Sequence, residues 1–230
     1  MRSLRSVALV RLPVALARVH WATAPGDVVE LELPEARDRR RLDDIVAGAG
    51  FELGRGRQGV RARRIRTLPD TVGPRMRMLV CGLNPSLVAA DAGFGFAGAT
   101  NRFWPAATAA GLVSHARDPL DALESDGVGM TDLVKRATPG TRDLDADEYR
   151  AGAERVERLV AWLRPGVVLF VGLEGWRAAV ERAATAGLQP SGFGGAPAYV
   201  MPSTSGLNAH VRLPDLVEHI RAAVALARET

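Results

Sequence analysis

Residues 78–86 have the sequence MLVCGLNPS, and this stretch indicates the fold class. Its first four residues are apolar, which is typical of a strand that is covered on both faces of a parallel sheet. The polar turn GLNPS (82–86) follows directly. Because ligands of parallel α/β sheets bind beyond the carboxyl ends of the strands, Asn84 and Ser86 are candidate binding residues, and a helix cap is the alternative role for this turn.

Two further apolar runs, 167–172 and 198–201, predict additional strands. Segments with helical signals lie between and after the strands, at 145–163, 174–186 and 214–228. Strands that alternate with helices form parallel sheets between helical layers. We therefore expect an α/β fold of three layers, α/β/α, with a central and mainly parallel sheet.

The sequence before this region follows a different pattern. Residues 28–33 alternate between apolar and acidic side chains, as in a half-exposed strand. Residues 39–49 place apolar side chains at helical spacing, and residues 59–67 alternate again. This order predicts a small α+β unit. The stretch 68–74, which contains two prolines and a glycine, is interpreted as a linker.

Basic residues gather in the first part of the chain. The whole chain has 30 Lys and Arg against 26 Asp and Glu, whereas its first 77 residues hold 16 arginines, no lysine and nine acids. The clusters RDRRR (37–41) and RARRIR (61–66) could bind phosphates, or they could be solvated faces of a helix and a strand. We expect a basic α+β N-terminal segment with its linker, 1–74, and a larger α/β domain, 75–230.

The composition excludes several classes of protein. Hydrophobic residues make up 47% and charged residues 24% of the 230 residues, as in globular and not in disordered chains. A single cysteine, Cys81, excludes an internal disulfide and a four-thiolate cluster. The first twenty residues resemble a secretory signal, but Arg11 and Arg18 interrupt its apolar stretch. No apolar run approaches the roughly 20 residues of a membrane span. We expect a cytoplasmic protein without a metal, a cofactor or membrane contact.

A resemblance to a known family rests on four motifs in order: GLNPS at 82–86, GFGFAGATNRFW at 93–104, GVGMTDLVKRATPGTRDL at 127–144 and MPSTSGLN at 201–208. Together they resemble the mismatch-specific uracil-DNA and thymine-DNA glycosylases, a branch of the uracil-DNA glycosylase superfamily. The resemblance covers more than half of the chain, from Leu79 to about His210. It implies that residues 75–230 are a catalytic domain with the uracil-DNA glycosylase-like fold.

The resemblance implies an enzyme of base excision repair. Family members flip a damaged or mispaired pyrimidine out of duplex DNA and hydrolyse its N-glycosidic bond. Uracil opposite guanine is the first expected substrate, and thymine or adducted cytosine opposite guanine remain open. The expected partner is double-stranded DNA with G·U or G·T mismatches, bound by a monomer that is associated with the nucleoid. Two alternatives stay open: a DNA-binding module that recognises uracil or mismatches without cleavage, and a hydrolase of free nucleotides.

The resemblance also implies three catalytic residues. Asn84 matches the residue that positions the attacking water, and an amide there predicts a slower enzyme than an aspartate would give, since an amide has no basic pKa. Thr131 matches a second water contact. Asp132 is the nearest carboxylate in a matching motif, so it is a candidate general base or cation stabiliser. A helix cap is the alternative role for Asp132.

Other residues are implied to contact the flipped base or the DNA. The residues expected to bind the base are Leu83, Ser86, Ala89, Phe96 and Ser203. Stacking of the pyrimidine on the Phe96 ring would contribute about 1–3 kcal/mol. Leu207 matches the wedge that enters the base stack, and His210 is expected to contact a phosphate. The residues expected to contact DNA are Ser205, Gly206, Leu207, Asn208 and His210.

The scarcity of lysine distinguishes two mechanisms. A glycosylase that also cuts the strand needs an amine that forms a Schiff base with the sugar. Lys135 is the only lysine in the chain, and its motif predicts that it faces solvent or a phosphate. We therefore expect a monofunctional glycosylase without lyase activity.

Overall fold

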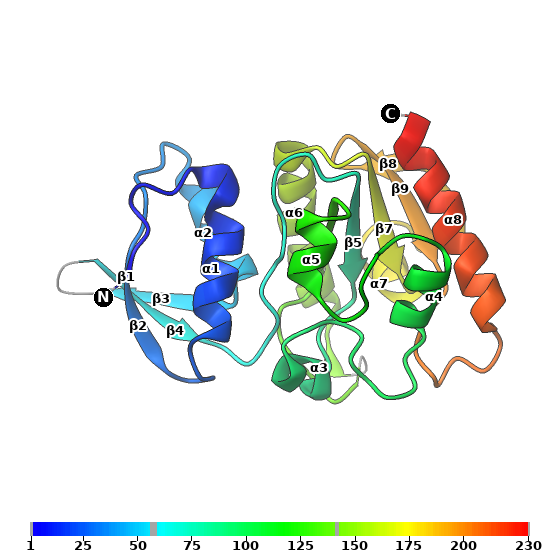
Figure 1. Cartoon of the computed structure of the whole chain (residues 1–230), viewed down its shortest axis with the longest axis horizontal. Coiled ribbons are helices and arrows are strands. Elements are labelled where there is room, and N and C mark those ends of the chain that lie inside the picture. Colours follow the sequence, from blue (N-terminus) through cyan, green and yellow to red (C-terminus); the bar gives the residue numbers. More distant parts are fainter. Residues whose placement is uncertain (1, 56–58, 141–142, 230) are drawn as a thin grey trace.

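The computed structural model describes residues 2–55, 59–140 and 143–229. The chain forms two sheets, each with its own helices, which lie side by side (Figure 1). The smaller sheet contains the N-terminal strands and the larger sheet contains the strands from residue 78 onward. No helix in the described part of the chain is both long enough and apolar enough to span a membrane.

The larger sheet has five strands. In chain order they are β5 (Met78–Gly82), β6 (Val128–Asp132), β7 (Val167–Val171), β8 (Gly187–Phe193) and β9 (Ala196–Met201). Their order in the sheet is β6-β5-β7-β9-β8. Strands β6, β5, β7 and β9 are parallel to one another, and β8 runs antiparallel to β9 at one edge. The expected mainly parallel sheet is therefore confirmed.

Helices cover both faces of this sheet. They are α3 (Leu87–Ala92), α4 (Phe103–Ala109), α5 (Pro119–Glu124), α6 (Ala146–Leu163), α7 (Leu173–Ala179) and α8 (Leu213–Glu229). Alternate residues of β5 enter two cores. Met78 and Val80 pack with α4 and α8, whereas Leu79 and Cys81 pack with α6 and α7. The fold thus has the expected three layers, and its apolar strand is buried on both faces.

The N-terminal unit has a small core of its own. Its elements are β1 (Arg2–Ser3), a 3-10 turn (Leu9–Arg11), α1 (Leu12–Trp21), β2 (Val28–Glu32), α2 (Arg39–Gly48), β3 (Phe51–Arg55) and β4 (Val60–Arg64). The strand order is β1-β2-β4-β3, with β4 antiparallel to both of its neighbours. Leu12 and Leu16 of α1 and Ile45 of α2 are buried in this core.

The stretch 68–74, interpreted as a linker from its prolines and glycine, is mostly buried. Residues 67–73 are buried, and Thr71 pairs with Met130 of β6 in an isolated antiparallel bridge. The segment therefore packs against the larger sheet, because its apolar residues Leu68 and Val72 enter the interior.

Two other elements are shorter than the patterns predict. The helix expected at 174–186 ends at Ala179, where the backbone leaves helical geometry at Val180 with φ −123°. The strand expected at 59–67 ends at Arg64. The helix thus lacks residues 180–186 of its expected range, which is more than the one or two residues by which helix ends usually vary, and the strand lacks residues 65–67.

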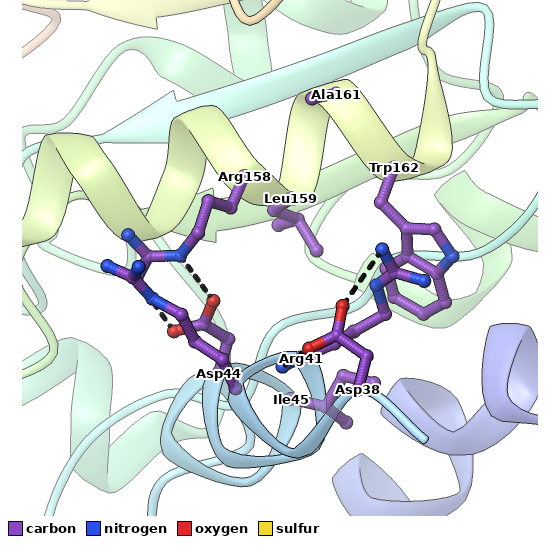
Figure 2. A pocket seen from close by; sticks show the side chains of 9 residues that line it. Asp38, Arg41, Asp44, Ile45, Arg158, Leu159, Ala161 and Trp162 are labelled. Carbon is purple, nitrogen blue, oxygen red and sulfur yellow. Dashed lines mark hydrogen bonds and ion pairs between the residues drawn. The ribbon is translucent and has the colours of Figure 1, made fainter. Parts of the chain in front are cut away.

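Paired charges join α2 to α6. Arg158 donates two hydrogen bonds to the Asp44 carboxylate, at 2.7 and 2.9 Å. The Arg41 guanidinium lies 5.2 Å from the centroid of the Trp162 ring and pairs with Asp38. Figure 2 shows these contacts on either side of a cavity of about 230 Å³. Since the acids and bases around it neutralise each other, we interpret this cavity as part of the interface between the two units.

Candidate active site

A cavity of about 220 Å³ lies beyond the carboxyl ends of β5 and β6. Its walls come from the turn after β5, the glycine-rich loop before α4 and the loop after β9. The structure brings eight of the predicted site residues together in these walls: Leu83, Asn84, Ser86, Ala89, Phe96, Asp132, Ser205 and Gly206. The cavity therefore occupies the place where parallel α/β sheets bind ligands.

Asn84 is held in one orientation by its amide nitrogen. Nδ2 donates to Thr138 Oγ1 at 2.8 Å, to the Arg136 carbonyl at 3.0 Å and to the Pro85 carbonyl at 3.2 Å. Thr138 is fixed in turn, because its hydroxyl donates to the Gly140 carbonyl at 2.8 Å. These contacts use the donor side of the amide, so its oxygen is the atom that can bind a ligand or a water in the cavity.

The Asp132 carboxylate reaches the cavity past a glycine. A Cβ atom at Gly82 would lie 2.4 Å from Asp132 Oδ1 and 3.6 Å from Phe96 Cζ, so only glycine fits at this position of β5. Burial raises the pKa of Asp132 to about 6, although the positive charge of Lys135 opposes the shift. The carboxyl group is therefore ionised at neutral pH and has a pKa that suits proton transfer.

A glycine-rich loop presents Phe96 to the cavity. The Phe96 ring stacks on the buried ring of Phe103, with centroids 4.1 Å apart and an interplanar angle of 25°. Trp104 fixes the loop by donating its indole N–H to the Gly95 carbonyl at 2.8 Å. Phe96 has φ +59°, a conformation that is costly for a residue other than glycine and is often retained at functional sites. The ring thus rests on a rigid base in the cavity wall.

Arg102 clamps the loop that follows β9. Its guanidinium donates to the Ser205 carbonyl at 2.9 Å, to the Asn208 carbonyl at 2.8 Å and to the Val211 carbonyl. Its backbone N–H donates to the Thr204 carbonyl at 2.9 Å. One side chain therefore determines the path of the whole loop relative to α4.

Leu207 lies at the tip of the clamped loop. The preceding Gly206 packs so closely that a Cβ atom there would lie 2.3 Å from Thr100 Oγ1. Leu207 is 96% exposed, and the next most exposed large apolar residue in the described ranges is Val88 at 59%. An apolar side chain held out in solvent by an ordered loop is suited to insertion into a partner.

Thr131 is not among the residues that line this cavity. Its buried hydroxyl donates to Asp70 Oδ1 at 2.7 Å and accepts a hydrogen bond from Arg155 at 3.1 Å. The hydroxyl therefore serves a buried polar network, and this placement does not support the implied water contact of Thr131.

Three other predicted residues also lie outside the cavity. Ser203 accepts a hydrogen bond from the Ser205 backbone N–H at 3.3 Å, so it shapes the loop. The Asn208 side chain donates to the Ser203 carbonyl at 3.0 Å. His210 is exposed beyond the loop tip. Base contact by Ser203 and DNA contact by Asn208 and His210 stay predictions.

The sequence was compared with models of known protein families. The family model of the uracil DNA glycosylase superfamily matches residues 69–225, about two thirds of the chain. The chain belongs to the uracil DNA glycosylase superfamily. This membership supports DNA as the molecule acted on and hydrolysis of the bond between base and sugar as the reaction.

The motif of Lys135 predicts that its side chain faces solvent or a phosphate, and this prediction is wrong. Its Nζ lies 2.8 Å from Asp70 Oδ1, and its side chain is only 11% exposed. Arg155 pairs with the other oxygen of Asp70 at 2.7 Å. Burial raises the pKa of the Asp70 carboxyl, but Arg155 and Lys135 outweigh that effect and hold it below its usual value.

The sequence did not predict roles for three residues that hold the cavity walls or the network next to them: Asp70, Arg102 and Thr138. Asp70 stands between the buried residues Leu68 and Val72, and this apolar flanking could have indicated burial. Arg102 lies within a quoted motif, but the carbonyls that it clamps are more than 100 residues away. No local signal predicts such a contact.

Proposed function

We propose that the protein is a monofunctional, mismatch-specific uracil-DNA glycosylase. It flips uracil opposite guanine out of duplex DNA into the cavity and hydrolyses the bond between the base and C1′ of the sugar. The observation that carries this proposal is the convergence of Asn84, Phe96 and Asp132 on one cavity, next to the exposed Leu207. Superfamily membership supports the glycosylase chemistry, and the cavity supplies residues suited to each step.

Asn84 and Asp132 act on the attacking water in this mechanism. The Asn84 oxygen accepts a hydrogen bond from the water, since Nδ2 is already committed to three acceptors. The ionised Asp132 accepts a proton as the water oxygen attacks C1′, and its charge stabilises the positive charge that develops on the sugar. The base departs with the electron pair of the bond to C1′.

Phe96 and Leu207 stabilise the extruded state. The flipped pyrimidine stacks on Phe96, which Phe103 keeps in place. Leu207 enters the base stack where the uracil was. These contacts act equally on any extruded uracil, and uracil opposite guanine is favoured over uracil opposite adenine because extrusion costs less free energy for a mispaired base.

A substrate panel tests this function. Base release is measured under single-turnover conditions for uracil opposite guanine, uracil opposite adenine, thymine opposite guanine and uracil in single-stranded DNA. We expect the fastest release from the G·U duplex. Equal rates on all uracil substrates would contradict mismatch specificity. Binding of the G·U duplex without any release would support the non-catalytic binding module instead.

Borohydride trapping tests the monofunctional assignment. A lysine ammonium in a buried ion pair with Asp70 is a poor nucleophile toward the sugar. We therefore expect an abasic product with an intact strand and no covalent complex between protein and DNA after reduction. A trapped complex that disappears in Lys135→Ala would contradict this assignment.

A further inference from the structure

An indole from outside the family-matched region contacts the loop that carries Phe96. Trp21 is the last residue of α1, and its Nε1 donates to the Gly93 carbonyl at 3.0 Å. The family match begins only at residue 69. This hydrogen bond therefore joins the N-terminal unit directly to the wall of the candidate active site.

The contact restricts the start of the loop. Gly93 ends α3 in the left-handed conformation, with φ +82°, and a Cβ atom there would lie 3.4 Å from the Trp21 ring. Two positions later, Trp104 donates to the Gly95 carbonyl at 2.8 Å. Two indoles thus hold two of the three carbonyls, those of Gly93 and Gly95, in the residues just before Phe96. Trp21, Phe96 and Asp132 also line one narrow crevice behind the loop.

Two further residues from the same segment reach this region. Arg66 donates to the Asp91 carboxylate of α3 at 2.8 Å. Leu68 packs against the loop: a Cβ atom placed at Gly95 would lie 3.8 Å from Leu68 Cδ1, an ordinary van der Waals contact. Asp91 and Gly95 lie on either side of Gly93 in the sequence. The N-terminal segment therefore contacts residues 91–95 at three positions and not only at Gly93.

We propose that the N-terminal segment is part of the active-site scaffold and that Trp21 is a positioning residue. Its indole holds Gly93 and thereby sets the place of the Phe96 ring against the flipped base. This inference rests on the proposed function in that Phe96 is taken as the stacking platform. It gives the N-terminal segment a role in the chemical step that is separate from any contact between its arginines and DNA.

The variant Trp21→Phe tests this role, because it keeps an aromatic ring and removes only the N–H donor and part of the ring. We expect the maximal single-turnover rate of uracil release from a G·U duplex to fall about five-fold, the effect of one lost neutral hydrogen bond. The enzyme concentration that gives half of this rate should stay as in the unchanged protein, and the melting temperature should fall by no more than about 2–4 °C, the shift expected for one lost hydrogen bond. Backbone amides of residues 93–97 should exchange hydrogen faster in the variant.

Trp162→Phe is the matched control, since Trp162 lies at the other contact between the two units, under Arg41 (Figure 2). It should leave both the rate and the exchange of residues 93–97 unchanged. A Trp21→Phe variant with unchanged rate and exchange would overturn the inference. A loss that appears equally in melting temperature, binding and rate would also overturn it, because it would show a role in folding alone. Absence of release by the unchanged protein would contradict the proposed function, whereas the exchange comparison would still decide whether Trp21 orders the loop.

Discussion

The Asp132 carboxyl group is the titratable group closest to the proposed chemistry. Its pKa of about 6 lies above the usual value of 3.8 because burial disfavours the charged form. The folded protein therefore binds a proton at Asp132 more readily than the unfolded chain does. Stability contributed by this group is greatest below pH 3.8 and is lost as the pH rises to about 6.

The proposed mechanism requires the ionised form of Asp132. The single-turnover rate of uracil release should fall as the pH decreases through about 6, because protonated Asp132 cannot accept a proton. Asp132→Asn should lower the rate and remove this pH dependence. At pH 7.5 the same variant should raise the free energy of unfolding by about 1–3 kcal/mol, because it removes a buried charge.

Rates across a pH series and denaturant unfolding measure these two effects. Asp147→Asn is the control, since the Asp147 side chain is 87% exposed. It should leave the rate unchanged and lower the free energy of unfolding by less than about 1 kcal/mol, because Asp147 lies in the first turn of α6 and pairs with Arg150. An Asp132→Asn variant that retains the full rate would show that Asp132 is a structural residue.

At the scale of elements, β5 and β6 must approach closely at their carboxyl ends. Gly82 pairs with Asp132 in register, and the missing side chain at Gly82 gives the Asp132 carboxylate its place. We predict that Gly82→Ala displaces this carboxylate, lowers the rate of uracil release and costs about 1–3 kcal/mol of stability through overpacking.

A glycine in a strand of the smaller sheet provides the comparison for Gly82→Ala. A Cβ atom at Gly54 of β3 would meet only the Arg61 carbonyl, at 3.8 Å, which is an ordinary contact. Gly54→Ala should therefore leave the rate of release unchanged. Both variants are compared by thermal unfolding and by single-turnover assay, and an active Gly82→Ala enzyme would show that the cavity tolerates a shifted Asp132.

The sequence predicts the strands that are apolar throughout, and it predicts β2 and β4 from their alternating patterns, but other strands carry no such signal. β5, β7 and β9 are recognisable because both of their faces are buried. β6 is not, since its sequence VGMTD ends in polar residues, and its Gly129 is required by the close approach of Met76. β3 and β8 have glycine and polar residues and were likewise not predicted.

The candidate site is predictable to a similar degree. Asn84, Phe96 and Asp132 belong to motifs whose joint order indicates one family, and the topology of a parallel sheet places their loops at one edge. Contacts made across long separations are not predictable in this way. Trp21 and Arg102 act on carbonyls that lie 72 or more residues away, and nothing near them in the sequence shows their partners.

At the scale of the whole molecule, Asp70 connects the two units. Its backbone N–H donates to the Gly48 carbonyl at the end of α2, and its carboxylate binds Lys135 and Arg155 of the larger domain. A Cβ atom at Gly48 would lie 2.3 Å from the Asp70 carboxylate, so the N-terminal unit packs directly onto this buried ion pair.

We predict that Asp70→Asn destabilises the protein by about 3–5 kcal/mol, since it leaves the charges of Lys135 and Arg155 buried without a counter-charge. Because the pKa of Asp70 is lowered in the folded state, this stabilisation is present at neutral pH and is lost as the pH falls below the usual pKa of 3.8.

Denaturant unfolding measures this loss, and Asp44→Asn is the control. Asp44 forms two hydrogen bonds with the partly exposed Arg158 at the same interface, so its replacement should cost about 1–2 kcal/mol, less than that of Asp70. Equal costs for the two variants would show that the Asp70 ion pairs are not the main connection between the units.

The central claim is that the turn after β5 holds the water that attacks the sugar of a flipped uracil. The most direct measurement is the single-turnover rate constant for uracil release from a G·U duplex by the unchanged protein and by Asn84→Ala, with the exposed substitution His115→Ala as control. We expect Asn84→Ala to lose about 100-fold or more in rate while it still binds the duplex, and His115→Ala to lose nothing. Release by Asn84→Ala at the rate of the unchanged protein would contradict the claim.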